Sequence, residues 1–354
     1  MKLRQKYAIV KNTLKGKGLK GMANLFCTLP SVAMEPVYVR SRPIFVQIEP
    51  TVSCNLQCPN CLSPTLARGK TMLSLAQFKE IIAQLPFVQK ISLVGAGEPL
   101  LNPELFDIIA YAKSKGLTIG FATNATLLDV NINEKIISSR LDWINISLDG
   151  ATKEVYERIR KGAHFETVLR NISDFMRAID KKKTKRPEVS VWFLALESNL
   201  DQLPAMVGLV EELGVKSLTV QTLHNWGSHG WKEKVAKERS YSPERLKEIL
   251  ARAAGEAREK HIGFNYVNAP DKKKAKRICQ WPWRSCYITV GGYITPCCLH
   301  GANPDIIHFG NIFSEPFERI WNNQLYQEFR KKLKTGQIPG ICVDCPSYFS
   351  KVKI

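Results

Sequence analysis

Long apolar stretches are missing from this sequence of 354 residues. No run of apolar side chains approaches the about 20 residues that a membrane-spanning helix needs, and the N-terminus has no apolar core of a secretory signal peptide. The chain nevertheless holds ten cysteines, which without an export signal indicate a reducing compartment and metal binding rather than disulfide bonds. We therefore expect a cytoplasmic protein, with a position at the inner face of the membrane as an alternative.

Acidic residues are also in short supply. The chain has 32 Asp and Glu against 51 Lys and Arg, which gives a net charge of +19. This excess favours an anionic partner, such as nucleic acid, an acidic peptide, a phosphorylated metabolite or an anionic membrane surface. The alternative is that the lysines only keep the surface solvated. The hydrophobic content of 44% is ordinary for a globular protein and allows a sizeable core.

The first group of cysteines lacks a fourth member. Cys54, Cys58 and Cys61 lie in a turn-forming stretch directly after a predicted strand at 44–49. A closed structural zinc site uses four protein ligands, so three thiolates fit zinc poorly. They suit a cluster of four irons and four sulfides in which one iron stays open to another ligand. Three unrelated buried cysteines are the alternative, but their clustering at a turn argues against it.

This motif, Cys54-x3-Cys58-x2-Cys61 after a first strand, resembles the signature of the radical S-adenosylmethionine (radical SAM) enzymes. The resemblance implies that S-adenosylmethionine binds the open iron of a [4Fe-4S] cluster through its amino and carboxylate groups. It also implies reductive cleavage of this cofactor to a 5′-deoxyadenosyl radical, which takes a hydrogen atom from the substrate. Asn60 stands before the third cysteine, where the family often has an aromatic residue near the adenine.

From residue 43 to about residue 222, predicted strands and helices alternate. The strands are expected at 44–49, 90–95, 117–123, 143–148, 189–196 and 217–221. The helices are expected at 75–85 (after Ser74 as N-cap), 103–115, 132–138, 153–160, 165–180 and 203–213. This alternation predicts an α/β fold with a parallel sheet. Six units are fewer than the eight of a closed barrel, and the resemblance implies an open partial (β/α)6 barrel with its active site at the carboxyl ends of the strands.

Glycines and polar residues follow the ends of these strands, and the resemblance assigns them to the cofactor. After the second strand the family has a glycine-rich segment whose acidic residue binds the amino group of S-adenosylmethionine. Glycines allow close backbone approach, and a carboxylate complements an ammonium group. The implied contacts are Gly95, Gly97 and Glu98 in this segment, Asn124 near the nucleoside, Ser147 and Asp149 near the ribose and methionine, and Arg160, in preference to Arg158, near the carboxylate. Without the resemblance, Asn124 is typical of an Asx turn and Arg160 of a solvated helix end.

A second group of six cysteines lies after residue 277. Gly291-Gly292 predicts the turn of a β-hairpin, and Cys342-x2-Cys345 follows a helix predicted at 316–333. The pair plus one cysteine from each end of the hairpin supplies four thiolates, which suits zinc or a second iron–sulfur cluster. The pattern resembles the C-terminal extension called SPASM, or twitch when shortened. It implies one auxiliary [4Fe-4S] cluster held by Cys279, Cys297, Cys342 and Cys345, with Cys286 and Cys298 spare and Cys298 able to replace Cys297.

These features divide the chain into four parts. They are a basic N-terminal extension at 1–42, a radical SAM partial barrel at 43–225, a linker with a helix (243–260) at 226–277, and a SPASM/twitch-like domain at 278–354. The extension alternates basic and apolar residues, as interfacial helices do. We favour the alternative of a helix packed outside the barrel, because Gly16, Gly18 and Gly21 weaken a long free helix. Candidates for a substrate loop follow the last strand: His224, Trp226, His229 and Trp231.

The resemblance implies a radical enzyme that acts on a C–H bond and is reduced by an electron donor such as flavodoxin or ferredoxin. It also implies that the auxiliary cluster either takes an electron from the substrate radical or binds the substrate directly, and ligation by four cysteines favours the first role. We expect a peptide or protein substrate, and the alternative is a small or lipid-linked molecule. A hypothesis of another class is a zinc protein that binds nucleic acid. The three-cysteine group and the residues after the strands speak against a nucleic-acid partner.

Overall fold

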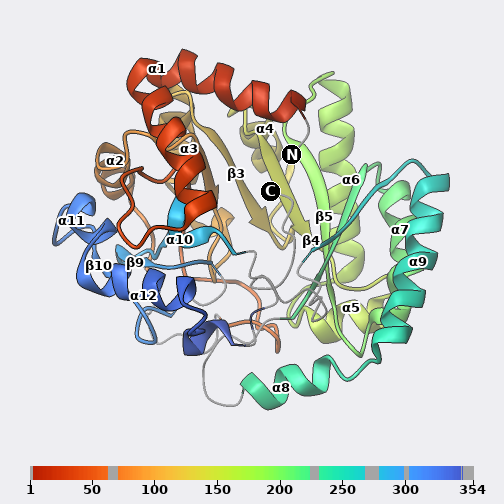
Figure 1. Cartoon of the computed structure of the whole chain (residues 1–354). Coiled ribbons are helices and arrows are strands. Elements are labelled where there is room, and N and C mark those ends of the chain that lie inside the picture. The colour runs from red at the N-terminus through yellow and green to blue at the C-terminus, as the bar shows by residue number, and fades with distance from the viewer. Residues whose placement is uncertain are drawn as a thin grey trace.

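The described residues form one sheet of ten strands (Figure 1). The computed structural model describes residues 3–62, 71–223, 231–267, 279–298, 303–343 and 345, with the backbone alone for 3–17 and 231–232. The strands are β1 (Phe45–Ile48), β2 (Lys90–Leu93), β3 (Thr118–Thr123), β4 (Trp143–Ser147), β5 (Glu188–Ala195), β6 (Ser217–Thr222), β7 (Gly263–Val267), β8 (Ser285–Ile288), β9 (Tyr293–Thr295) and β10 (Gly310–Asn311). Across the sheet their order is β10-β9-β8-β1-β2-β3-β4-β5-β6-β7.

Strands β1 to β6 are the six that the sequence predicts, and each pairs in parallel with the next. The connecting helices are α2 (Leu75–Ala83), α3 (Leu105–Ser114), α4 (Val130–Ser138), α5 (Lys153–Ile159), α6 (Phe165–Lys181) and α7 (Leu203–Glu212). Ser74 caps α2 as predicted, in a reciprocal capping box with Gln77. The expected α/β class and partial barrel are therefore confirmed.

Amphipathic sequence explains why the helices cover the sheet. In α6 the buried side chains recur every three, four or seven residues: Phe165, Val168, Ile172, Phe175 and Ile179. This spacing places them on one face of the helix, which packs inward while the charged face stays in solvent. Strands β2 and β3 are buried along most of their length, as expected for a parallel sheet with covered faces.

One strand lies in the region that was expected to be a linker. The described part of 226–277 carries α8 (Trp231–Glu238), the expected helix as α9 (Pro243–Glu259), and then β7. Strand β7 pairs in parallel with β6, and α9 packs against α7. The alternation of helix and strand therefore continues through this region and adds a seventh parallel strand to the barrel sheet. The substrate-loop residues His224, Trp226 and His229 lie outside the described residues.

The C-terminal region joins the same sheet. The predicted hairpin is present as β8 and β9, with Gly292 at a φ of +85° in the turn, and β8 lies in parallel beside β1. The single helix predicted at 316–333 is wrong, because two helices occur there, α11 (Phe317–Trp321) and α12 (Gln324–Lys334). The break is made by Asn322 and Asn323: Asn323 starts α12 by accepting the Tyr326 N–H at 3.0 Å.

The N-terminal extension is attached to this C-terminal region. It forms α1 (Leu3–Met34), which bends at Gly18 (φ +58°) and packs on α10 (Trp281–Arg284). The indole N–H of Trp283 donates to the Pro36 carbonyl at 2.9 Å, and that of Trp321 donates to the Ser41 carbonyl at 2.8 Å. From the sequence we favour a helix packed outside the barrel, and the second half of α1 is a helix that packs on the protein at α10. Among the described helices none is long and apolar enough to cross a membrane.

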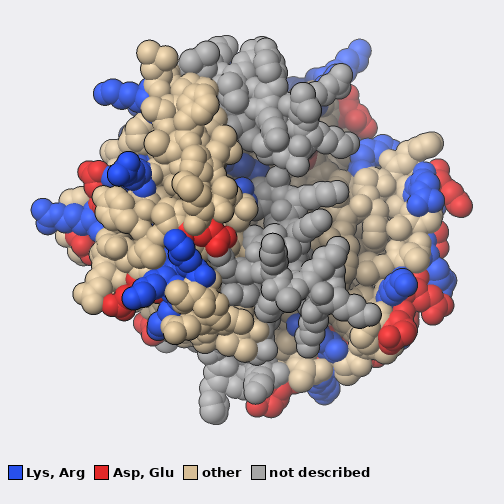
Figure 2. All heavy atoms as spheres, in the orientation of Figure 1, with Lys and Arg blue, Asp and Glu red and all other residues tan. Residues whose placement is uncertain are grey.

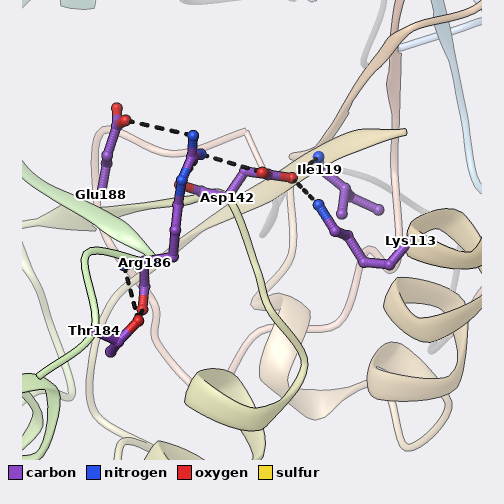
Figure 3. Close-up of polar contacts among 6 residues, drawn as sticks. All are labelled: Lys113, Ile119, Asp142, Thr184, Arg186 and Glu188. Atoms are coloured by element: carbon purple, nitrogen blue, oxygen red, sulfur yellow. Dashed lines mark hydrogen bonds and ion pairs between the residues drawn. The ribbon is translucent and has the colours of Figure 1, made fainter. Parts of the chain in front are cut away.

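A polar cluster joins neighbouring strands at their amino ends, opposite the motif-bearing edge (Figure 3). Asp142, just before β4, accepts the Ile119 N–H at 2.8 Å and pairs with Lys113 at 2.6 Å and Arg186 at 3.1 Å. The side chain of Asp142 is mostly buried, which strengthens these bonds. Together they hold β3, β4 and the segment before β5 in place relative to one another. The candidate functional residues lie at the other end of the same strands.

Candidate functional site

The loop that carries the first three cysteines is held at alternate residues. Five residues of this loop bond to neighbouring segments. The carbonyl oxygens of Thr51 and Ser53 accept the N–H groups of Gly97 (3.2 Å) and Glu98 (2.8 Å), and the side-chain oxygen of Asn55 accepts the side-chain amide of Asn124 (2.9 Å). The N–H of Gln57 donates to the carbonyl of Lys161 (2.9 Å), and the carbonyl of Pro59 accepts the ammonium group of Lys234 on α8. The loops after β2 and β3, the segment after α5 and helix α8 therefore position Cys54, Cys58 and Cys61 together.

Cys54 lies in a setting suited to a metal-bound thiolate. The N–H of Leu56 donates to its Sγ at 3.4 Å, and the side-chain amide of Asn124 lies 4.0 Å from the same sulfur. Burial raises the pKa of Cys54 to about 11, although the Leu56 N–H lowers it. A thiol of this kind loses its proton near neutral pH only when a positive centre stabilises the thiolate, and metal binding supplies one. The two donors favour the charged form of the sulfur.

Gly95 and Gly97, expected at the cofactor, are first of all needed for packing. A Cβ at Gly97 would lie 2.5 Å from the carbonyl oxygens of Thr51 and Ser53. A Cβ at Gly95 would lie 2.3 Å from Cγ of Glu49. The cysteine loop and the β2 loop approach each other too closely for any side chain between them.

Glu49, at the end of β1, is a residue whose role the sequence did not reveal. Its carboxylate is fully buried and accepts the Ala96 N–H at 3.2 Å, the Tyr287 hydroxyl at 3.1 Å and the Val290 N–H at 3.1 Å. One bond thus comes from the glycine-rich β2 loop and two from the β8–β9 hairpin. The signal in the sequence is an acidic residue at the end of a strand that is expected to be buried, because a buried carboxylate needs hydrogen-bond donors.

Glu98 occupies a buried position at the centre of the strand ends. One oxygen accepts the Thr123 hydroxyl at 2.8 Å and the Leu100 N–H at 3.2 Å, and the other accepts the Asn124 N–H at 2.8 Å. Burial raises the pKa of Glu98 to about 7, and these donors oppose the rise. Three bonds fill three of the roughly four acceptor positions of a carboxylate, which leaves capacity for one further donor.

Asp149 and Arg160, both expected to contact the cofactor, bind each other. Asp149 is almost completely buried, its Oδ2 pairs with Nε of Arg160 at 2.5 Å, and its Oδ1 accepts the Leu194 N–H at 2.7 Å. Arg158 instead donates to the Ser198 carbonyl on the exposed side. The structure thus turns Arg160 toward the strand ends, and Ser147, half-buried, lies two residues before Asp149 at the end of β4.

Three buried polar atoms beside the cysteine loop lack a hydrogen-bond partner among the described residues: Ser53 Oγ, Asn60 Oδ1 and the Tyr156 hydroxyl. Tyr156 is fully buried, and burial raises its pKa, with Arg160, Asp149 and Cys58 close enough to modify it. Buried polar atoms without partners are costly in native proteins, and a bound water, ion or ligand can supply the missing partner. The residues around Cys54–Cys61 therefore fit a bound polar group.

The expected auxiliary cysteines converge on one pocket. Cys279, Cys297, Cys342 and Cys345 line a space of about 330 Å³, part of it open to solvent, together with Trp281, Pro282, Pro296, Phe329 and Leu333. Cys286 is buried in β8 and does not line it. Burial raises the pKa of Cys298, and the nearby thiols of Cys297 and Cys345 raise it further, so this spare cysteine lies at the edge of the same group.

The geometry also bears on the metal. In the described part of the chain, no three Cys, His, Asp or Glu side chains converge closely enough for a single metal ion. A closed structural zinc site takes four protein ligands, whereas the first cysteine group supplies three thiols.

Comparison with protein families identifies the domains. The model of the radical SAM superfamily matches residues 48–186, and that of the SPASM iron–sulfur cluster-binding domain matches residues 279–346. This chain is a radical SAM enzyme with a C-terminal SPASM domain. The two family resemblances inferred from the cysteine patterns are confirmed, and so are iron–sulfur clusters and S-adenosylmethionine as its cofactors. The individual ligands and cofactor contacts stay predictions.

Relatives span nearly the whole chain. The AdoMet-dependent heme synthase of Methanosarcina barkeri is 27% identical over 87% of this chain and 90% of its own length. The PqqA peptide cyclase of Gluconobacter oxydans is 26% identical over 86% of this chain and 83% of its own. In fold, this radical SAM enzyme is similar to Streptococcus suis SuiB bound to precursor peptide SuiA, with a TM-score of 0.65, 16% identity, and 88% and 71% of the two chains covered.

The tight contact at Gly97 gives a test of the site. We expect Gly97→Ala to reduce the iron bound per chain at the first cysteine group, because the methyl group pushes the loop away from Thr51 and Ser53. The measurement is iron content together with S-adenosylmethionine cleavage. Gly208→Ala is the matched control, since Gly208 lies in α7 with nothing within 4 Å of an added Cβ. Equal iron loading in both variants would show that the close approach does not shape the site.

Proposed function

We propose that this radical SAM enzyme modifies a peptide or protein substrate by removing a hydrogen atom from one of its C–H bonds. The observation that supports the site assignment is the cysteine loop itself, held at alternate residues by the neighbouring loops. When bound, S-adenosylmethionine and its cluster supply a 5′-deoxyadenosyl radical, formed together with methionine when one electron breaks the C5′–S bond, and this radical takes the hydrogen atom. A low-potential one-electron carrier such as flavodoxin or ferredoxin supplies that electron.

Two sets of cysteines hold the clusters in this proposal. Cys54, Cys58 and Cys61 bind the cluster that takes S-adenosylmethionine. The auxiliary cluster takes the four thiols that line one pocket: Cys279, Cys297, Cys342 and Cys345. Four protein ligands leave no open iron, so this cluster serves electron transfer rather than substrate binding.

The chain's own polar groups orient the cofactor. Glu98 offers its remaining acceptor position to the ammonium group of S-adenosylmethionine, and the backbone at Gly95 and Gly97 stays close to it. Asp149 aligns Arg160 for the cofactor carboxylate, and Ser147 and Asn124 lie at the neighbouring strand ends. The buried hydroxyl of Tyr156 supplies a further donor beside them. Each of these groups is already positioned, so little reorganisation accompanies binding.

The substrate class rests on relatives and on charge. The PqqA peptide cyclase is a relative named for action on a peptide. A net charge of +19 also suits an acidic peptide chain, because complementary charge speeds association. The AdoMet-dependent heme synthase is equally similar in sequence and supports the alternative of a small-molecule substrate.

Cysteine variants test the cluster assignment. We expect the wild-type chain, prepared without oxygen, to bind about eight irons, and Cys58→Ala to bind about four and to lose reductive cleavage of S-adenosylmethionine. Cys345→Ala should also fall to about four irons while it retains cleavage, because the auxiliary cluster does not hold the cofactor. Cys27→Ala, at an exposed cysteine of α1, is the control and should match wild type. Cleavage by Cys58→Ala would remove the assignment.

A deuterium experiment tests the substrate class. A set of short acidic peptides is synthesised with deuterium at the side-chain carbons, and each peptide is incubated with the loaded enzyme. We expect deuterium in the 5′-deoxyadenosine product and a higher yield of that product, because the radical takes its hydrogen from the substrate. If deuterium reaches 5′-deoxyadenosine from a labelled small molecule and from none of the peptides, the alternative of a small-molecule substrate is favoured.

We also propose that the outward face of α1 contacts an anionic membrane surface. After the bend at Gly18, the side of α1 that faces the protein is mostly polar: Asn24, Thr28 and Ser31 are buried there. The side that faces solvent is apolar, with exposed fractions of 83% for Leu19, 65% for Phe26 and 61% for Leu29. Figure 2 shows this arm at the upper left as mainly uncharged atoms with basic atoms at its margin. A helix that packs on a protein normally shows the opposite arrangement.

The polar inner face of α1 has its own partners. Asn24 exchanges two hydrogen bonds with the backbone of Arg42, at 2.7 and 3.1 Å, and the hydroxyl of Ser31 lies 3.3 Å from that of Ser41. The helix is therefore fixed with its apolar side outward. The sequence of residues 1–42 adds nine basic residues against the single acid Glu35: Lys2, Arg4, Lys6, Lys11, Lys15, Lys17, Lys20, Arg40 and Arg42. Apolar insertion with basic flanks is the signature of interfacial helices.

Vesicle sedimentation tests this contact. Wild-type protein should bind vesicles that contain phosphatidylserine more strongly than neutral vesicles, and Phe26→Asp with Leu29→Asp should weaken that binding, because charge opposes insertion. Val130→Asp is the control, since Val130 is 71% exposed on a different helix, α4. Iron content and cleavage should stay unchanged in both. Binding that the α1 variant does not weaken, or no binding by wild type, would end the proposal.

A further inference from the structure

Arg330 in α12 is a fully buried cation whose described partners are all neutral. Its Nε donates to the Pro282 carbonyl at 2.9 Å, and one terminal nitrogen donates to Asn322 Oδ1 at 3.0 Å and to the Val37 carbonyl at 3.4 Å. The guanidinium group lies 4.5 Å from the ring centre of Trp321 and 4.2 Å from that of Tyr326. The other terminal nitrogen, NH2, has no hydrogen-bond partner in the described part of the chain.

A buried charge of this kind needs a compensating charge nearby. Carbonyl oxygens and aromatic faces offset part of the cost of removing a guanidinium group from water, but a buried ion usually has an opposite charge within reach. Among the described residues no carboxylate forms an ion pair with Arg330. The ionisable groups beside Arg330 are the phenol of Tyr326 and the thiol of Cys286, and burial raises the pKa of both, which favours their neutral forms. The compensating charge must therefore come from another kind of group.

The wall of the auxiliary pocket identifies that group. Pro282, whose carbonyl accepts the Arg330 Nε–H, lines the pocket together with the four cysteines. Phe329 and Leu333, the neighbours of Arg330 along α12, line it as well. Arg330 therefore bonds to one residue of the pocket wall and lies on the same helix as two others.

We propose that Arg330 sets the reduction potential of the auxiliary iron–sulfur cluster. This inference rests on the proposed cluster at Cys279, Cys297, Cys342 and Cys345. A [4Fe-4S] cluster with four thiolates is an anion, and reduction by one electron adds one negative charge without requiring a proton. A fixed cation in a low-dielectric surrounding stabilises the more negative state, so it raises the potential and makes the cluster a better acceptor for an electron from the substrate radical.

A bracing role is the competing explanation, because Arg330 also links Pro282, Asn322 and Val37. A set of variants distinguishes the effect of the positive charge from the effect of the hydrogen bonds. Arg330→Lys keeps a cation but loses the planar fork, whereas Arg330→Gln and Arg330→Met lose the charge. Lys332→Gln is the matched control, since Lys332 is exposed on the same helix and the same loss of charge there is screened by water.

The experiment is a redox titration of the full-length protein followed by electron paramagnetic resonance, in a Cys58→Ala background that leaves the auxiliary cluster alone. We expect Arg330→Gln to lower the ratio of reduced to oxidised cluster at least about tenfold at a fixed solution potential, which corresponds to about 59 mV for one electron. Arg330→Lys and Lys332→Gln should stay within about threefold of the background. A shift in Arg330→Lys equal to that in Arg330→Gln, or none in either, would overturn the proposal.

Measuring the iron content distinguishes failure of the Arg330 proposal from failure of the proposed auxiliary cluster. If the Cys58→Ala background binds no iron, the auxiliary cluster itself is absent and the proposed function fails first. If Arg330→Gln loses its iron, Arg330→Met provides the neutral variant that retains packing against the two rings. Loss of iron in both neutral variants with retention in Arg330→Lys supports the charge, because only the cation then stabilises the anionic cluster. Loss in all three variants would assign Arg330 to bracing alone.

Discussion

The buried carboxylate of Glu49 is the contact on which the arrangement of both cysteine groups depends. It accepts one hydrogen bond from the β2 loop, at Ala96, and two from the C-terminal hairpin, at Tyr287 and Val290. Hydrogen bonds to a buried charge are stronger than those between neutral groups, and each donor left without its acceptor would be costly. The close approach of Gly95 follows directly, because a side chain there would occupy the place of the Glu49 side chain.

From this point the first site is built outward by backbone contacts. The cysteine loop bonds to the β2 loop, the β3 loop and the segment after α5, and these bonds fix the course of the segment that carries the three cysteines. A second, smaller apolar cluster of Leu62, Ile159, Leu196, Leu223 and Val235 holds the far end of the loop against α5, β5 and α8. Precise placement of ligands here results from many weak restraints on one short segment, which is how a flexible loop reaches the rigidity that metal chemistry needs.

Much of this was predictable, because the signals are local. Three cysteines at fixed spacing after an apolar strand, and strands that alternate with helices, specify the barrel and the family without long-range information. The signals failed where tertiary contacts decide. Strand β7 has no fully buried residue, whereas each of β1 to β6 has at least two, so its sequence carries a weaker apolar signal. The break between α11 and α12 arises because Asn322 bonds both backbone groups of Val39, 283 residues away in the sequence. The ion pair between Asp149 and Arg160 is likewise a contact between two loops. From the sequence each residue was predicted to contact the cofactor, and their contact with each other was not.

The pairing of β8 with β1 has a consequence for the chemistry. Residues 45–48 of β1 bond in register to residues 285–288 of β8. Cys54 follows the carboxyl end of β1, whereas β9 runs back antiparallel to β8 and brings Cys297 toward the amino end of the same ladder. The SPASM domain therefore does not dock on the barrel through a surface that can slide or rotate; it extends the same sheet. Strand pairs with both faces buried move little, so the distance between the two cysteine groups is set by hydrogen bonds between main chains. An electron passing from a substrate radical to an auxiliary cluster needs a fixed distance of this kind, and Glu49 adds a second connection between the barrel and the hairpin at the turn end of β8.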